Sequence, residues 1–569
     1  MQVTIRVDGE KIETQTDKNL SEVLQENNIK LPDLAYQLPN SQIIHTDLVE
    51  DVVDKIVKRA TDITIQEKTR VNVHSGLARQ HRQAVFRMIY DDCQLNCDHN
   101  KNNDSQINCE TCSQIEQYLA DDLPTQVNKI EFPIHRMAQA AEIDVAVCTG
   151  CNNCVEACDR VGINYLSLDG EGEIKYAVPS QDEKVDCIYC GQCTVNCPVK
   201  SAREQSQVQQ IENYLADKEL ITVVQMAPSV RTSIGEEFDV EVGTNLEKQM
   251  FTAFRELGFS YVFDVNMGAD ITTFVEAAEL VGRLNNQGQL PMFTSCCPAW
   301  VKFIEFYYPE MIPHLTEARS PQIHSGVAYK TWWAQKNNID PKKIRVISVM
   351  PCTSKQYEAR QKRLMVDDLY PVDCTLTTRE MAYLLKKNKI DLPSLPPGEL
   401  DDVGQYSGAG AIYGASGGVM ESALRTACYM LSGKDLPKLE FEQVRGMAGI
   451  KKAEVEVAGQ ILKVAVAATA VNFHKLVKEV KENPKSYHYI EFMACPGGCI
   501  GGGGQPIPAS DEKTAKRIES LYKIDTEMKM RQAHQNPVVN EFVNYVQQQP
   551  QERQKQLLYR EFEPKQKGE

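Results

Sequence analysis

The sequence contains no apolar run long enough to cross a bilayer and no segment rich in lysine or arginine. A membrane-spanning helix needs about 18 or more apolar residues in succession. The amino terminus, MQVTIRVDGEKIE, alternates polar and apolar residues where a signal peptide would have an apolar core. The 62 lysines and arginines are outnumbered by 78 aspartates and glutamates, which gives a formal net charge of −16. Without a signal core or a membrane span, the protein is expected to be cytoplasmic. Nucleic acids and anionic membranes attract basic patches, and with none here we expect the protein to bind neither.

The chain also lacks a nucleotide-binding motif, and it has no cysteine before residue 93. A reaction that used a nicotinamide cofactor would therefore depend on a partner chain. The 569 residues exceed what one hydrophobic core usually serves, so about two to four domains are expected.

Patterns along the chain predict a multidomain protein of the α/β and α+β classes. The first residues contain the alternating segment VTIRV and the amphipathic segment LSEVLQENN, which together predict a small sheet with a packed helix. In the second half, strands such as ITVVQM, IRVISVM and HYIEFM alternate with helical patterns, as in an α/β domain with mainly parallel sheets. The expected parts are a β-grasp-like domain at 1–75, a four-cysteine module at 76–128, a double-cluster domain at 129–215, a catalytic domain at 216–547 and a polar tail, mobile or docked on the surface, at 548–569.

The nineteen cysteines lie in tight groups within a large chain, which favours metal ligation over a disulfide scaffold. Only Cys374 and Cys428 lie outside the groups, and we interpret both as buried apolar residues. The groups are Cys93, Cys97, Cys109 and Cys112; Cys148, Cys151, Cys154 and Cys158; Cys187, Cys190, Cys193 and Cys197; and Cys296, Cys297, Cys352, Cys495 and Cys499.

The two central groups have the same spacing, C-x2-C-x2-C-x3-C, and the second is followed by Pro198. This repeat is the ligand pattern of two ferredoxin-type 4Fe-4S clusters, in which the fourth cysteine of each run binds the other cluster. Two zinc sites are the alternative, but zinc ligand pairs are normally separated by longer intervals. The predicted ligand sets are Cys148, Cys151, Cys154 and Cys197 for one cluster, and Cys187, Cys190, Cys193 and Cys158 for the other.

The last cysteine group is spread over three loops: TSCCPAW at 294–300, MPCTSKQYE at 350–358 and FMACPGGCIGGGGQP at 492–506. Each loop follows an apolar strand, so we expect the thiolates to gather at the carboxyl ends of adjacent strands, where open α/β sheets bind ligands. Helix amino termini and glycine-rich backbone would offer N–H donors to an anionic cluster there.

These three loops resemble the signature motifs of iron-iron hydrogenases, and the resemblance extends from about residue 130 to about residue 545. It implies an H-cluster, a 4Fe-4S cubane joined through one cysteine to a diiron unit with carbon monoxide, cyanide and a bridging dithiolate amine. By position the cubane ligands are Cys297, Cys352, Cys495 and Cys499, of which Cys499 bridges to the diiron unit. The residues implied around the diiron unit are Ala227, Pro228, Ser229, Gln322, Met350, Lys355, Tyr413 and Met493.

Among these residues, Lys355 and Ser229, with Pro228, would face the cyanides, because an ammonium and a hydroxyl suit anionic ligands. Without the resemblance, Lys355 would be read as an ordinary surface lysine. Met350 and Met493 would be read as core residues, and packing is at least part of their role.

The resemblance also implies a proton path through Cys296, Glu276, Thr316 and Glu279 that ends near Arg283. Cys296 is next to a ligand and remains a thiol, whose ordinary pKa near 8.5 allows proton exchange around neutral pH. In the helical stretch DITTFVEAAELVGR, Glu276, Glu279 and Arg283 fall on one face. Taken alone, Glu279 and Arg283 would be read as a solvent-exposed pair of little energetic consequence.

The sequence departs from the family pattern at three places. KNLSEVLQENNIKLPDLAYQLP resembles the amino-terminal 2Fe-2S domain of larger relatives, but Ala35 stands where a ligand cysteine is expected, so we predict no 2Fe-2S cluster. The first cysteine group offers four thiolates, with His99 as a substitute ligand, where relatives use one histidine and three cysteines. We favour a third accessory 4Fe-4S cluster there, with zinc as the rival. Tyr413 occupies a position where phenylalanine is usual.

The sequence leaves two other functions open: a hydrogen sensor or NAD-linked complex subunit of the same family, and a non-catalytic iron-sulfur assembly relative. The intact Cys296, Lys355, Glu276 and Cys499 argue against the assembly protein. The partners implied by the resemblance are ferredoxin or a similar electron carrier, and the maturation proteins that supply the diiron unit. It further implies the hydrogen metabolism of an anaerobic cell.

Overall fold

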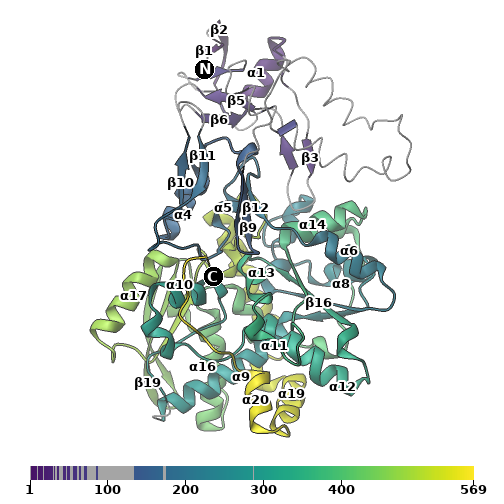
Figure 1. The fold of residues 1–569 in the computed structure, drawn as a ribbon, viewed down its shortest axis with the longest axis vertical. Helices are drawn as coiled ribbons and strands as arrows, with labels where there is room; N and C mark the ends of the chain where they lie inside the picture. The colour runs from purple at the N-terminus through teal and green to yellow at the C-terminus, as the bar shows by residue number, and fades with distance from the viewer. Residues whose placement is uncertain are drawn as a thin grey trace.

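The structure is a computed structural model that describes residues 133–170, 175–285, 288–436 and 438–568, together with shorter stretches between residues 2 and 86. Figure 1 shows the amino-terminal elements at one end of the molecule and the catalytic part at the other. No helix among the described residues is both long and apolar enough to span a membrane.

The amino-terminal stretches form a five-stranded sheet in the order β2-β1-β7-β5-β6. Helix α1 (Leu20–Glu26) packs its Leu20, Val23 and Leu24 against apolar side chains of this sheet, as the amphipathic pattern predicted. A separate hairpin pairs β3 (Ala35–Gln37) with β4 (Ile43–His45). The strands of the sheet are β1 (Gln2–Val7), β2 (Glu10–Gln15), β5 (Leu48–Asp51), β6 (Ile56–Arg59) and β7 (Arg70–Asn72).

The two ferredoxin-type cysteine runs lie in a module of short strands and two helices. Each run leads into a short helix, the first into α4 (Asn153–Val161) and the second into α5 (Gln192–Val195). This module contains a three-stranded sheet, β12-β9-β8, and a two-stranded sheet, β10-β11. Its strands are β8 (Ile134–Met137), β9 (Ala141–Asp144), β10 (Leu166–Asp169), β11 (Tyr176–Pro179) and β12 (Ala202–Glu204).

The catalytic part contains two four-stranded sheets. The first, β14-β13-β16-β17, is parallel throughout, and in the second, β15-β20-β19-β18, only β18 runs antiparallel to its neighbour. The strands of the first sheet are β13 (Ile221–Met226), β14 (Tyr261–Asp264), β16 (Ile344–Met350) and β17 (Cys374–Thr377). Those of the second are β15 (Met292–Phe293), β18 (Ile450–Val457), β19 (Gln460–Ala468) and β20 (Tyr489–Met493).

Helix α9 (Val265–Leu284) joins the cores of the two sheets. Its Met267, Ile271 and Val275 pack in the apolar cluster of the first sheet, whereas Ala277 and Leu280 pack in that of the second. It also packs against α11 (Pro321–Ala328) and α16 (Gly418–Ser432). Glu276 lies on the part of α9 that these elements cover, so the helix can hold this titratable side chain away from water.

The carboxy-terminal helices wrap back over the catalytic part. They are α18 (Asp511–Glu527), α19 (Pro537–Gln547) and α20 (Gln551–Leu558). Of the two states expected for residues 548–569, the structure shows the docked one: Arg560 is buried, and Lys567 Nζ donates to the carbonyls of Ser180 and Asp182 at 2.9 and 2.8 Å. The tail therefore connects the catalytic part to the cysteine-rich module.

Candidate cluster and active site

The three cysteine loops meet at the carboxyl ends of strands from both sheets. Cys296 and Cys297 follow β15 and precede α10 (Pro298–Tyr307), and Cys352 follows β16 and precedes α13 (Ser354–Ala359). The third loop, with Cys495, follows β20. The expectation of adjacent strands in one open sheet is wrong for Cys352, because β16 belongs to the first sheet and β15 and β20 to the second. The site is thus built between two sheets whose parallel strands end at the same place.

The four expected cubane ligands, Cys297, Cys352, Cys495 and Cys499, line one cavity. Cys296 and, from the ferredoxin-type module, Cys190 line it as well. Gly498 lets the third loop pass close to its neighbours: it has a φ of 99°, and a Cβ at this position would lie 2.6 Å from the backbone nitrogen of Ser416. Four thiols around a closed space are the donor set and the arrangement that a cubane requires.

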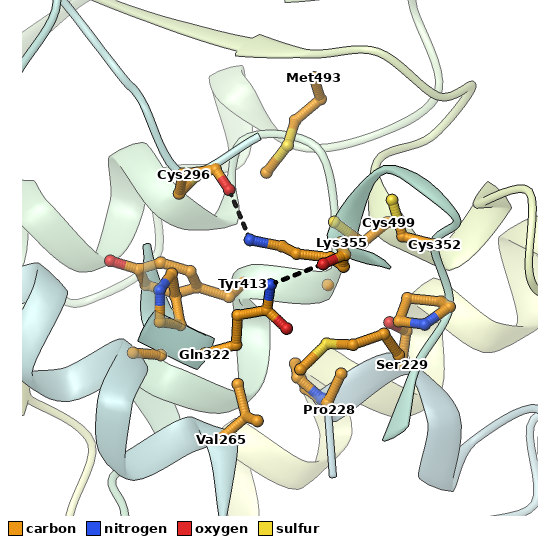
Figure 2. A pocket seen from close by; sticks show the side chains of 16 residues that line it. Pro228, Ser229, Val265, Cys296, Gln322, Cys352, Lys355, Tyr413, Met493 and Cys499 are labelled. Atoms are coloured by element: carbon orange, nitrogen blue, oxygen red, sulfur yellow. Dashed lines mark hydrogen bonds between the residues drawn. The ribbon is translucent and has the colours of Figure 1, made fainter. Parts of the chain in front are cut away.

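A second cavity shares a wall with the first. Cys296, Cys352, Lys355, Met493 and Cys499 line both cavities. Every residue that the sequence placed around a diiron unit lines the second cavity, and Figure 2 shows the side chains of those it labels converging on it. These are Ala227, Pro228, Ser229, Gln322, Met350, Lys355, Tyr413 and Met493, and the apolar Val265, Ala269 and Pro321 complete the wall.

Polar atoms without hydrogen-bond partners indicate that the second cavity binds a polar ligand. Ser229 Oγ and Gln322 Oε1 are buried and have no hydrogen-bond partner among the described residues. Lys355 is buried as well, and its ammonium donates to the Cys296 carbonyl at 3.0 Å (Figure 2). It also donates to Glu358 Oε2 at 2.9 Å. Reading Lys355 as a surface residue is therefore wrong. An ammonium and an unpaired hydroxyl in an otherwise apolar cavity suit anionic ligands.

The ferredoxin-type cysteines line two further cavities in crossed sets. Cys148, Cys151, Cys154 and Cys197 line one, and Cys158, Cys187, Cys190 and Cys193 line the other. Backbone amides point at several of the sulfurs, for example Ala177 N at Cys148 Sγ, at 3.3 Å. In the described part of the chain no three histidine, cysteine, aspartate or glutamate side chains close around a single metal ion.

The proton-path residues fall into two groups. The inner group is Cys296 and Glu276, and the outer group is Thr316, Glu279 and Arg283. In the inner group, Glu276 is fully buried and its Oε1 accepts a hydrogen bond of 2.5 Å from the Tyr489 hydroxyl. Burial raises the pKa of Glu276 to about 8. Burial also raises the pKa of Cys296 well above its ordinary value, and the charge of nearby Glu276 raises it further.

In the outer group, Glu279 accepts hydrogen bonds from Thr316 Oγ1 at 2.6 Å and from Arg283 Nη2 at 2.5 Å. Arg283 Nη2 also donates to the Leu315 carbonyl at 2.6 Å, and its side chain is only 8% exposed. The solvent-exposed reading of the Glu279–Arg283 pair is therefore wrong. Among the described residues no hydrogen bond joins Glu276 to Glu279.

Comparisons with known proteins agree with this geometry. The family model described as iron only hydrogenase large subunit, C-terminal domain, matches residues 220–503, and iron hydrogenase small subunit matches residues 511–565. The chain is 36% identical to iron hydrogenase 1 of Clostridium pasteurianum over 95% of this chain and 96% of that one.

The chain belongs to the iron-only hydrogenase family. It is also 38% identical to the NADP-reducing hydrogenase subunit HndD of Solidesulfovibrio fructosivorans, over 74% of each chain. A solved structure, a variant of the FeFe-hydrogenase HydA1 of Chlamydomonas reinhardtii, is similar with a TM-score of 0.57 and 36% identity, and covers 63% of this chain and 99% of that one. The parallel-sheet α/β architecture expected from the sequence is that of the family. The large-subunit and small-subunit regions lie here in a single chain.

Sequence reasoning missed three residues of this hydrogenase's site: Tyr489, Glu358 and Arg560. Glu358 is fully buried and accepts hydrogen bonds from Lys355 (2.9 Å), Ser320 (2.8 Å), Gln322 (2.8 Å) and Arg560 (3.0 Å). Burial alone would lower the pKa of Lys355, but the Glu358 carboxylate outweighs burial and raises it. Glu358 stands in the quoted MPCTSKQYE motif, one helical turn after Lys355, which was a usable signal.

Two other cysteine predictions have different outcomes. Cys374 and Cys428 are buried within apolar clusters, as predicted. Cys93, Cys97, Cys109, Cys112 and His99, and most of the module expected at 76–128, lie outside the described residues.

Proposed function

We propose that this hydrogenase interconverts two protons and two electrons with molecular hydrogen at an H-cluster held in the two adjoining cavities. One observation carries the proposal: the cavity lined by the four expected cubane ligands shares a wall with a second cavity. Cys296 and the Lys355 ammonium line both cavities, and the unpaired Ser229 hydroxyl lines the second.

The residues present fit the cofactor. Cys297, Cys352, Cys495 and Cys499 would hold the cubane, and by its position in the family motif Cys499 would be the bridge to the diiron unit. Like Cys352, Cys499 lines both cavities. When bound, the diiron unit supplies the metal centre at which hydrogen forms or splits.

Lys355 and Ser229, beside Pro228, would donate hydrogen bonds to the cyanide ligands. The Gln322 amide, which donates to Glu358 at 2.8 Å, helps to hold the anchor of Lys355. Met350, Met493, Ala227 and the Tyr413 ring form the remaining wall and exclude water from the reacting atoms.

Proton delivery falls to Cys296 and Glu276. Cys296 lines both cavities and ligates nothing, so its thiol can give a proton toward the diiron unit and recover one from Glu276. Thr316, Glu279 and Arg283 form the outer end of the path. A bound water between Glu276 and Glu279 would complete it, because no side chain of the described residues bridges them.

Electrons would enter through the two ferredoxin-type clusters. Cys190 lines the cavity of the nearer cluster and also the cubane cavity, and Thr353 and Ser354 donate to the Tyr189 carbonyl at 2.8 and 2.6 Å, so the nearer cluster lies next to the cubane. The first cysteine group would hold a third accessory 4Fe-4S cluster, with zinc as the rival. A ferredoxin or similar carrier in the cytoplasm would deliver the electrons, and maturation proteins would supply the diiron unit.

A second role is favoured by the similarity to a subunit of an NADP-reducing hydrogenase. In that role the same site would exchange electrons with a partner chain that binds the nucleotide. The chemistry at the cavities would be unchanged.

The test is hydrogen evolution from a chemically reduced dye by protein loaded with the diiron unit, compared with protein that carries only cubanes. We expect turnover, together with infrared bands of bound carbon monoxide and cyanide, only in the loaded sample. Absence of both from fully loaded protein would refute the proposed function.

A further inference from the structure

The two carboxyl oxygens of Glu276 have different surroundings. Oε1 accepts the 2.5 Å hydrogen bond from the Tyr489 hydroxyl, whereas Oε2 is buried and accepts none from the described residues. Tyr489 belongs to β20, the strand that leads into the third cysteine loop, and no sequence motif had pointed to it.

We propose that Tyr489 is a positioning residue of the proton path, whose hydroxyl fixes the Glu276 carboxyl so that the transferable proton resides on Oε2. This inference rests on the proposed function, because it requires Glu276 to relay protons to Cys296. The proton passes from Oε2 to the Cys296 sulfur, and a proton from the outer group then replaces it, so that the carboxyl returns to its starting state.

The position of the Tyr489 ring is fixed by its strand. Tyr489 is fully buried and pairs in register with Met292 of β15 and Val464 of β19. A phenol has a single hydrogen to donate, and here it goes to Oε1. A protonated carboxyl that already accepts a hydrogen bond on one oxygen retains its own hydrogen on the other.

The second tyrosine near Glu276 has a different task. The Tyr413 hydroxyl lies 2.8 Å from Thr273 Oγ1, one turn of α9 before Glu276, and its ring lines the diiron cavity. Among the described residues, Tyr489 alone donates a side-chain hydrogen bond to the Glu276 carboxyl.

Several charged or titratable groups face Glu276 from the surrounding elements. Burial raises its pKa most, the Tyr489 hydrogen bond lowers it, the Glu279 and Glu491 carboxylates raise it, and Arg283 lowers it. The Tyr413 hydroxyl and the Cys296 thiol also lie within its electrostatic influence. Because the Tyr489 hydroxyl stabilises the ionised carboxylate, its removal should raise the pKa of Glu276 above about 8.

The test compares Tyr489→Phe with Tyr487→Phe in the loaded enzyme. The control loses a similar hydrogen bond, from the Tyr487 hydroxyl to Glu479 at 2.7 Å, two residues earlier in the chain and outside the site. One readout is the infrared band of the protonated Glu276 carboxyl as a function of pH, assigned by its loss in Glu276→Gln. The other is the pH profile of hydrogen evolution and of hydrogen oxidation.

In Tyr489→Phe we expect the carboxyl titration to move up by about one pH unit, since a hydrogen bond to a charged group contributes about that much. Hydrogen evolution should persist to higher pH, and hydrogen oxidation should begin at higher pH, because Glu276 holds its proton longer. Tyr487→Phe should match the wild type. A titration and profiles in Tyr489→Phe that match the wild type would overturn the inference.

A ring-fluorinated tyrosine at position 489 retains the shape and donates more strongly, so the titration should move to lower pH. If Tyr489→Phe does not fold, an unshifted titration in the fluorinated protein would still overturn the inference. Failure of the wild type to evolve hydrogen or to show carbon monoxide and cyanide bands would refute the proposed function instead.

Discussion

Replacing Glu358 by glutamine tests whether a buried charge network holds the active-site lysine. Glu358 accepts hydrogen bonds from four donors, two of them the cations Lys355 and Arg560. A glutamine has only one acceptor oxygen. Its amide NH2 group would stand where the second carboxylate oxygen was, facing a hydrogen-bond donor that it cannot accept from. The substitution therefore removes both the charge and half of the acceptors.

The cost follows from the burial of all three charged groups. Glu358 is fully buried, and Arg560 and Lys355 are 3% and 8% exposed. Breaking a buried ion pair from one side costs about 3 to 5 kcal/mol. At about 2 °C per kcal/mol for a large domain, the unfolding midpoint of the catalytic part should fall by about 6 to 10 °C. Loss of the anchor on Lys355 should lower hydrogen evolution by about 10- to 150-fold, as expected for one hydrogen bond to a charged group.

The assay combines thermal unfolding, the infrared spectrum of the cyanide ligands and hydrogen evolution. Glu305→Gln is the matched control: Glu305 is also buried and accepts from Arg363 at 2.6 and 3.0 Å, but the Arg363 side chain is 17% exposed and water can reach it. The control should unfold at a moderately lower temperature and retain the wild-type cyanide bands. An unchanged midpoint together with unchanged turnover in Glu358→Gln would refute the reasoning.

Three further predictions concern single features. Tyr413→Phe retains the ring in the cavity wall and loses only the hydrogen bond with Thr273, so hydrogen evolution should change by less than about tenfold; complete loss would make the hydroxyl part of the mechanism. Elemental analysis of fully loaded protein should find roughly 18 irons per chain, from three accessory cubanes and six irons in the H-cluster, whereas about 14 irons with one zinc would assign the first cysteine group to zinc. Arg560→Ala should lower the unfolding midpoint by several degrees, whereas Arg553→Ala should leave it nearly unchanged, because the Arg553–Asp367 pair is solvent-exposed; equal effects would contradict the buried network.

The sequence was sufficient where the chemistry is local. The C-x2-C-x2-C-x3-C spacing predicted the crossed sets of cysteines that line two cavities, and the three loops predicted the group that lines the third. In each case the ligands are a few residues apart or stand at the ends of recognisable strands, so that the pattern constrains the geometry.

The sequence was insufficient where contacts join distant segments. Tyr489 and Glu276 are 213 residues apart, and Arg560 and Glu358 are 202 apart, so neither pair leaves a periodic signal. The expectation that all three loops follow adjacent strands of one sheet failed for the same reason, because strand order depends on packing between distant segments. The burial of Lys355 and Arg283 followed only from the family resemblance, since both are polar residues that the tertiary fold alone buries.

The central claim is that the site separates cluster ligation by Cys297, Cys352, Cys495 and Cys499 from proton delivery by Cys296. The most direct test measures the infrared spectrum and hydrogen evolution on the same sample of loaded Cys296→Ala protein. We predict unchanged carbon monoxide and cyanide bands with turnover lower by about 10²- to 10⁴-fold, and partial recovery in Cys296→Asp. Turnover near the wild-type rate with intact bands would contradict the proton path, and loss of the bands would show that Cys296 is a ligand.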